Sequence, residues 1–225
     1  MAWEFSAQIH ALTGFDADTN TASEVGQATY RELTVQWLEE AAKEIINLLP
    51  PELKFKCTTD STLNNSATTL NLDTVGKILY VTRKNSDNGE QVPCRQIEPW
   101  QGGLTEDSSN IIHYATLTDP VYWTTSSSAS ALLFVKPTPT ANQTAIVHHV
   151  NYPSINYDDT IIGNFPDEAE YLVPIRAAIT AAEYMLMVEE DPEIFLPMIQ
   201  NLKQDYNQGL QALGVGVQQP QQAGR

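Results

Sequence analysis

The sequence predicts an α+β fold, in which a helical bundle built from both chain ends carries an inserted antiparallel β-sandwich or barrel. Helical apolar patterns occupy residues 29–49 and the region after residue 166. The residues between them are rich in Thr, Ser, Val, Ile and Tyr, with turn residues at regular intervals. Each helical pattern has one apolar stripe, which a helix cannot bury alone. We therefore expect a bundle domain at 1–53 and 156–213, a β domain at 54–155, and a flexible tail at 214–225.

The first long helix has two candidate starts and one clear end. Thr21-x-x-Glu24 and Thr29-x-x-Glu32 are both capping boxes, so the helix begins at one or the other. Pro50-Pro51 ends it, because proline donates no backbone hydrogen bond and disfavours a helical residue before it. Upstream, Ile9–Phe15 is expected to form a short apolar anchor.

The central region is predicted to contain eight short strands. Asn88-Gly89 is a strong hairpin signal, and Pro120 and Pro137 mark further breaks. This spacing is typical of a small sandwich or barrel. The expected strands are 54–58, 68–72, 78–83, 91–97, 113–118, 121–125, 132–136 and 145–152.

Two helices are predicted in the C-terminal part, at 167–188 and 192–212. Pro166 and the acids that follow it suit a helix N-terminus, while Pro174 predicts a kink or a short break. Asp191 and Pro192 start the second helix, and Gly214 is a plausible stop.

The tail at 214–225 is rich in Gln and Gly and has too little apolar mass to fold alone. We expect it to be flexible in the free chain and to become ordered against a partner. Only Val215 and Val217 could anchor it there.

Composition excludes several function classes. The chain has 28 acidic and 12 basic residues, a formal charge of −16 spread along its length, so a nucleic-acid or anionic-membrane footprint is not expected. The N-terminus lacks the features of a secretory signal, and no apolar run approaches the length of about 20 residues of a membrane span. Cys57 and Cys94 are expected to be reduced.

No motif for catalysis, cofactor binding or metal binding is apparent, so the chain is not predicted to be an enzyme. His148 and His149 are adjacent in a strand pattern, and adjacent strand residues point to opposite faces. They therefore cannot chelate one metal together.

Aromatic residues in predicted loops and at strand ends are the best candidates for an interface. With the two tail valines, the candidate interface residues are Trp100, Tyr122, Trp123, Tyr152, Tyr157, Val215 and Val217. An alternative is a carbohydrate-binding or hydrolytic module that uses the first three rings as a sugar platform. Its only candidate acids are Glu98 with Glu106 or Asp119.

Residues 29–190 resemble the neck proteins of tailed bacteriophages, of the head-to-tail adaptor or connector type. The motifs that carry the resemblance are all structural, and none of them is a catalytic or ligand-binding motif. The segments that carry it are Trp37–Pro50, Asp73–Arg83, Cys94–Ile97, Tyr114–Tyr122, Val135–Pro139, and Asn164–Val173 with Ala177-Ala178.

The resemblance implies a non-catalytic homo-oligomeric ring of about twelve copies in the virion neck, assembled in the host cytoplasm. The ring would sit on the portal protein, hold a downstream neck or tail protein, and let DNA pass without specific binding. Negative lumen walls would suit that passage, because they repel phosphate. A tail terminator, a stopper or a decoration protein remains an alternative.

Overall fold

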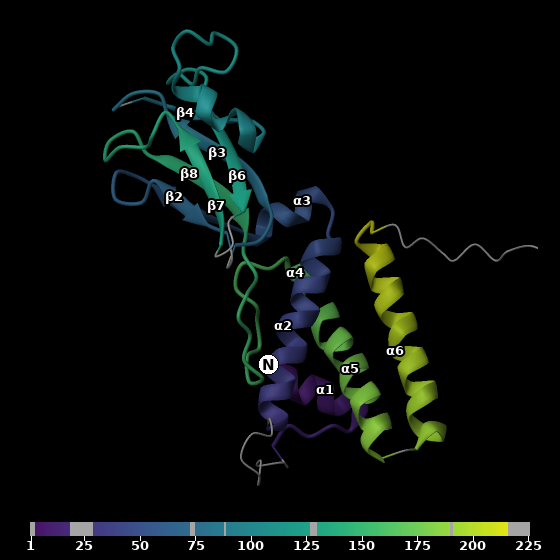
Figure 1. Cartoon of the computed structure of the whole chain (residues 1–225). Helices are drawn as coiled ribbons and strands as arrows, with labels where there is room; N and C mark the ends of the chain where they lie inside the picture. Colours follow the sequence, from purple (N-terminus) through teal and green to yellow (C-terminus); the bar gives the residue numbers. More distant parts are fainter. Residues whose placement is uncertain are drawn as a thin grey trace, which may run out of the picture. The chain divides into compact units, whose positions relative to one another are not determined.

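The computed structural model describes residues 3–18, 29–72, 75–87, 89–126, 130–189 and 191–215, which form a mixed α/β fold (Figure 1). These residues contain six α-helices and two four-stranded sheets. They fall into two compact units: the helical unit, from Met1–Cys57 and Tyr152–Arg225, and the β unit, Thr58–Asn151. Each junction lies four residues from the expected boundary.

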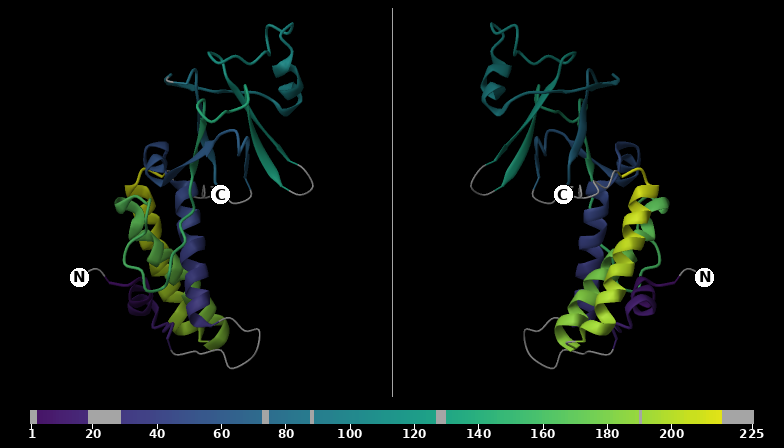
Figure 2. Two further views of the ribbon diagram at one scale, coloured as in Figure 1. Left: turned by 90° about the vertical axis from the view of Figure 1, so that its left-hand side faces the viewer. Right: turned by 90° about the vertical axis from the view of Figure 1, so that its right-hand side faces the viewer.

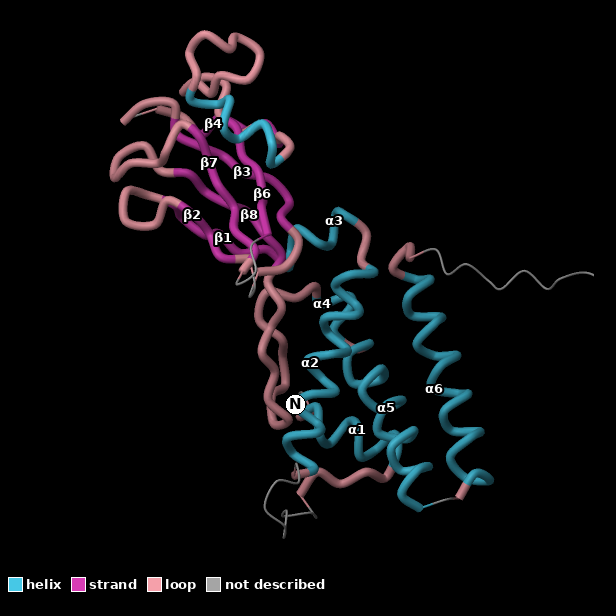
Figure 3. The backbone as a smooth tube through the Cα atoms, in the orientation of Figure 1, coloured by secondary structure: helices cyan, strands magenta, loops and turns pink. Residues whose placement is uncertain are grey.

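The helical unit contains every α-helix among the described residues, and the cyan segment of Figure 3 that lies in the β unit is the 3₁₀ helix η2 (Pro99–Glu106). The helix expected at 192–212 has those bounds, and the one expected at 167–188 is divided at Tyr171, shortly before Pro174. The elements are α1 (Phe5–Thr13), α2 (Tyr30–Leu48), α3 (Pro51–Lys54), the 3₁₀ turn η1 (Phe55–Cys57), α4 (Asp167–Glu170), α5 (Leu172–Glu189) and α6 (Pro192–Ala212).

Helix α2 begins at the second of its two candidate capping boxes. The Thr29 hydroxyl accepts the Glu32 amide at 3.2 Å, and the Glu32 carboxylate accepts the Thr29 amide at 2.7 Å. Two of the free amides at the helix start are thereby satisfied. The other candidate start, at Thr21, lies outside the described residues.

Helix α6 ends in a Schellman motif, which corrects the expected start of the tail. Gly214 has φ 77°, a conformation that favours glycine. Its amide donates to Gln211 at 3.0 Å, and the Val215 amide donates to Leu210 at 3.1 Å. Gly214 and Val215 therefore close the helix instead of belonging to a free segment. The remaining tail, with Val217, lies outside the described residues.

Helix α5 is the centre of the helical unit and packs against α1, α2 and α6 (Figure 2). Small buried side chains allow neighbouring helices to approach closely. The stretch Asp167–Glu189 is long and apolar enough to cross a membrane, contrary to the expectation from sequence. Its packed neighbours are those of a core helix. Four of its alanines are fully buried: Ala177, Ala178, Ala181 and Ala182.

Helix α1 was expected only as an apolar anchor. Phe5 and Ile9 are buried, and the helix packs on α5. Glu4, its N-cap residue, makes no side-chain cap. Instead, the Phe5 and Ser6 amides each donate over 2.9 Å, to the carbonyl oxygens of Asp159 and Tyr157. The helix start thus depends on a segment about 150 residues away in the sequence.

Two side-chain clusters attach the N-terminal part of the chain to α5. Phe15 lies against Tyr30, Trp37 and Tyr184 with ring centroids 4.8, 5.2 and 6.3 Å away. Such tilted and edge contacts add to the free energy of burial.

The second cluster is polar. Glu44 of α2 accepts from Arg176 of α5 at 2.8 Å and from the Tyr206 hydroxyl of α6 at 3.2 Å. Burial, with the Glu44 carboxylate adding to it, raises the pKa of Tyr206. One carboxylate therefore joins three helices that come from opposite ends of the chain.

The β unit contains two sheets, with strand orders β1-β8-β3-β4 and β2-β7-β6-β5. Side chains from both sheets share one apolar cluster that includes Leu63, Val81, Leu133 and Val147. The sheets do not close, so the barrel alternative is wrong, and β5 pairs with β6 in parallel. The strands are β1 (Thr58–Leu63), β2 (Thr69–Asn71), β3 (Ile78–Lys84), β4 (Gln91–Pro93), β5 (Arg95–Gln96), β6 (Val121–Ser126), β7 (Ala131–Lys136) and β8 (Ala145–Val150).

Three of the eight expected strands are wrong or altered. Residues 54–58 are mostly helical, because Pro51 at the start of α3 favours a helical turn, and β1 follows them. The expected strand 91–97 divides into β4 and β5, which belong to different sheets. Residues 113–118 form turns in place of a strand.

A larger side chain on the buried face of α5 should test how closely the neighbouring helices pack against it. Ala181→Leu adds three carbons where the side chain is fully buried, and we expect a loss of about 1–3 kcal/mol in unfolding free energy. Ala7→Leu, on the exposed face of α1, is the control and should change stability by less than about 0.5 kcal/mol. Equal urea-denaturation midpoints for both variants would contradict the packing.

Candidate interaction surfaces

The β unit presents Trp100 on a 3₁₀ helix, η2 (Pro99–Glu106), which is seated on a buried tryptophan. A Cβ on Gly102 would lie 2.8 Å from the Trp123 ring, so the backbone of η2 rests directly on that ring. Trp123 in turn stacks on Phe134 with centroids 5.5 Å apart. Buried Trp123 is thus the support that fixes the position of η2.

Beside η2, an irregular loop exposes two consecutive isoleucines. Ile111 is 92% exposed, Ile112 77% and Trp100 70%. The ring centroids of Trp100 and His113 lie 6.2 Å apart, and His113 directly follows Ile112 in the chain. We call Trp100, Ile111 and Ile112 the loop surface. Exposed apolar side chains that gather in this way mark interaction sites.

The loop is ordered by its own hydrogen bonds. The Asp107 carboxylate accepts from the backbone and hydroxyl of Ser109, and these bonds lower the pKa of Asp107. Asn110 accepts the Tyr114 amide at 2.9 Å, and the Ala115 amide donates to Thr105 at 3.0 Å. A loop that is already ordered loses less entropy when it binds.

The helical unit has its own exposed apolar surface, where α5 turns into α6. Met187 is 79% exposed and Ile194 is 59% exposed, on either side of the turn. Val188 and Leu196 are also exposed. We call these four side chains the hairpin tip. Sequence reasoning missed both the tip and the isoleucine pair, because the sequence alone does not show which apolar side chains stay exposed at the end of a helix or in a loop.

Two of the predicted interface residues are core residues. Tyr122 and Trp123 were expected at strand ends or in loops, but both lie within β6 and are 8% exposed. Trp100 is exposed as an interface residue should be. Val215 is half-buried in the cap of α6, and Val217 lies outside the described residues. The sugar platform therefore loses two of its three rings.

Tyr152 and Tyr157 are half-buried and contact α2. Tyr152 donates to the Asn47 side chain at 3.1 Å, and the Lys43 ammonium lies 5.2 Å from its ring centroid. Arg31 lies 5.0 Å from the centroid of Tyr157. Both rings thus help to attach the segment that follows the β unit to α2.

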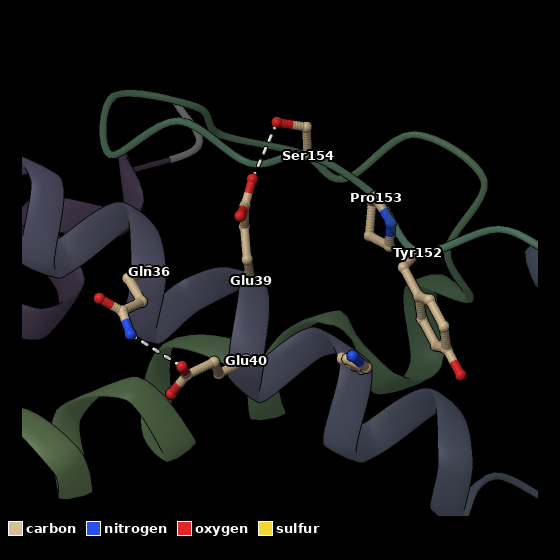
Figure 4. Close-up of a pocket in the computed structure, with 7 residues that line it drawn as sticks. Gln36, Glu39, Glu40, Tyr152, Pro153 and Ser154 are labelled. Carbon is tan, nitrogen blue, oxygen red and sulfur yellow. Dashed lines mark hydrogen bonds between the residues drawn. The ribbon is translucent and has the colours of Figure 1, made fainter. Parts of the chain in front are cut away.

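That segment borders an open groove of about 360 Å³ on α2 (Figure 4). Ser154 donates to Glu39 at 2.8 Å, and Gln36 donates to Glu40 at 2.9 Å. The polar groups of the groove bind one another across it or along α2, so the groove is explained by the packing of residues 152–154 on the helix. Its lining offers no arrangement of groups that points to a ligand.

Two of the candidate acids and the His148-His149 pair have structural partners. Glu106 pairs with Lys136, which lowers the pKa of Glu106, and Asp119 pairs with Arg95 at 3.0 Å. His148 contacts Asp60 at 2.5 Å, and His149 contacts Ser61 at 2.9 Å. Among the described residues, no group of three or more potential ligands could hold a metal ion.

Alanine at Gly102 should disturb the support of η2. Gly102→Ala forces Trp123 or η2 to move, and we expect a loss of about 1–3 kcal/mol with a changed near-ultraviolet circular dichroism spectrum. Gly103→Ala is the matched control, because nothing lies within 4 Å of its added carbon. If both variants unfold at the same temperature, the contact does not support η2.

The cysteines should react slowly in the folded chain. Burial raises the pKa of Cys57 to about 11 and that of Cys94 to about 12, and nearby Arg83 only partly opposes the shift at Cys94. Because the thiolate is the nucleophile, labelling by a disulfide reagent at pH 8 should be slow, and it should become fast in denaturant. Cys94→Ala assigns the two signals. Rapid labelling of native protein would contradict this environment.

No protein family and no curated protein matches this chain significantly.

Proposed function

We propose that this chain is a structural virion protein of the phage neck, a ring subunit of the head-to-tail adaptor or connector type. The observation that carries the proposal is that two compact units each present a separate exposed apolar surface. A joint between two different neighbours needs one such surface for each of them. In this proposal the helical unit is a bundle that docks on the portal, and the β unit is an inserted sandwich that faces the next neck or tail protein.

The charge distribution supports the same function. The helical unit has 20 acidic and 7 basic residues, while the β unit has 8 and 5. A charge of −13 on one unit and −3 on the other gives the two docking regions different electrostatic character. In a ring that conducts DNA, carboxylates repel the phosphates and so favour passage over adhesion.

The burial of two aromatic rings disfavours one competing function, whereas the exposed apolar surfaces fit three others. A sugar-binding module is disfavoured, because Tyr122 and Trp123 are buried below the surface. A tail terminator, a stopper or a decoration protein would present exposed apolar surfaces as well. Direct binding to a portal ring distinguishes an adaptor from these three.

The test is assembly with the portal protein encoded by the same genome. Native mass spectrometry and negative-stain microscopy of the full chain, with and without the purified portal ring, should reveal a complex with about twelve copies of this chain. A chain that stays monomeric and does not associate with the portal at micromolar concentration would overturn the proposal.

A further inference from the structure

We propose that the hairpin tip is a docking element whose partner is a different protein, with an apolar pocket rimmed by Lys and Arg. The proposal rests on the proposed function in one respect, namely that the partner is the portal ring. Beyond that function, the proposal names the site on this chain that makes the contact and the chemistry of the partner surface that binds this site.

The tip is exposed but firmly supported. On α6, Phe195 and Ile199 are buried and hold the helix against α5. One turn further, Lys203 of α6 pairs with Glu183 of α5 at 2.7 Å. The exposed side chains of Met187 and Ile194 therefore project from a fixed helical hairpin. Binding would order little more than the side chains themselves.

The charge around the tip determines the kind of partner. Residues 177–202 contain five acidic residues and no Lys or Arg. Among them, Glu189, Asp191 and Glu193 lie within a few residues of the exposed apolar side chains. A partner that covers this apolar centre must also meet its carboxylates, and a basic rim does so favourably.

A second copy of this chain cannot supply that rim well. Among the described residues, Arg31, Lys56, Arg95, Lys136, Arg176 and Lys203 already form ion pairs with carboxylates. Arg83 is buried and donates to three backbone carbonyls. This leaves Lys43, Lys54, Lys77 and Lys84 among the described residues, and Lys54 donates to the Asn47 carbonyl at 2.7 Å. With a net charge of −16, self-docking at the tip would place carboxylates against carboxylates.

The experiment compares two double variants of the full chain. Met187→Asp with Ile194→Asp alters the hairpin tip, and Ile111→Asp with Ile112→Asp makes a matched change on the loop surface. The probe is the purified portal ring, with affinity measured by interferometry at low and high NaCl. We expect the tip variant to bind on the order of tenfold more weakly or worse, and the loop variant to bind as the native chain does. Native affinity should also fall as salt rises.

A second measurement covers the case in which the tip variant misfolds. A photo-crosslinking residue at Met187 in the otherwise native chain should crosslink to the portal, whereas the same residue at Ile111 should not. Crosslinks from Met187 to another copy of this chain, or to vesicles of neutral lipid, would overturn the proposal.

The outcomes separate this inference from the proposed function. If the native chain binds the portal and the tip variant binds equally well, the inference is wrong and the adaptor function stands. If the native chain does not bind the portal at all, both are overturned.

Discussion

The helical unit depends on one helix, α5, whose buried face is rich in alanine. Because Ala177, Ala178, Ala181 and Ala182 occupy so little space, α5 accepts α1, α2 and α6 as close neighbours. Both ends of the chain therefore meet on a helix that starts after residue 170. Glu44 completes the arrangement, since its carboxylate binds Arg176 and Tyr206 from two other helices. The ion pair between Glu44 and Arg176 is partly exposed, so its contribution to stability is modest. Its main effect is to fix which helices meet.

Each unit has its own core and its own exposed apolar surface. The β unit is connected to the helical unit at both of its ends, and it has a separate core shared by its two sheets. Within it, buried Trp123 supports η2, which in turn exposes Trp100. In the helical unit, the hairpin tip projects from helices that are already packed. Rigid elements that present apolar side chains are suited to docking, because little conformational entropy remains to be lost.

The sequence predicts elements well where the signal is local. Pro50 and Pro192 give the end of α2 and the start of α6 to within a residue or two, whereas the sequence leaves the start of α2 open between Thr21 and Thr29. Prediction fails where the determinant is distant. The first amides of helix α1 donate to the carbonyl oxygens of Tyr157 and Asp159, and no local pattern reveals these bonds. Trp100 and Trp123 were both expected in loops or at strand ends, yet one is exposed and the other buried, because η2 folds onto the second ring.

The central claim is that a helical unit organised on α5 docks through its tip while the β unit stays free for another neighbour. Hydrogen–deuterium exchange of the chain, alone and bound to the portal ring, tests it most directly. We expect the slowest exchange in the free chain at residues 177–182. On binding, residues 187–196 should gain protection and residues 99–114 should exchange as before. Protection at residues 99–114 with none at the tip would contradict it.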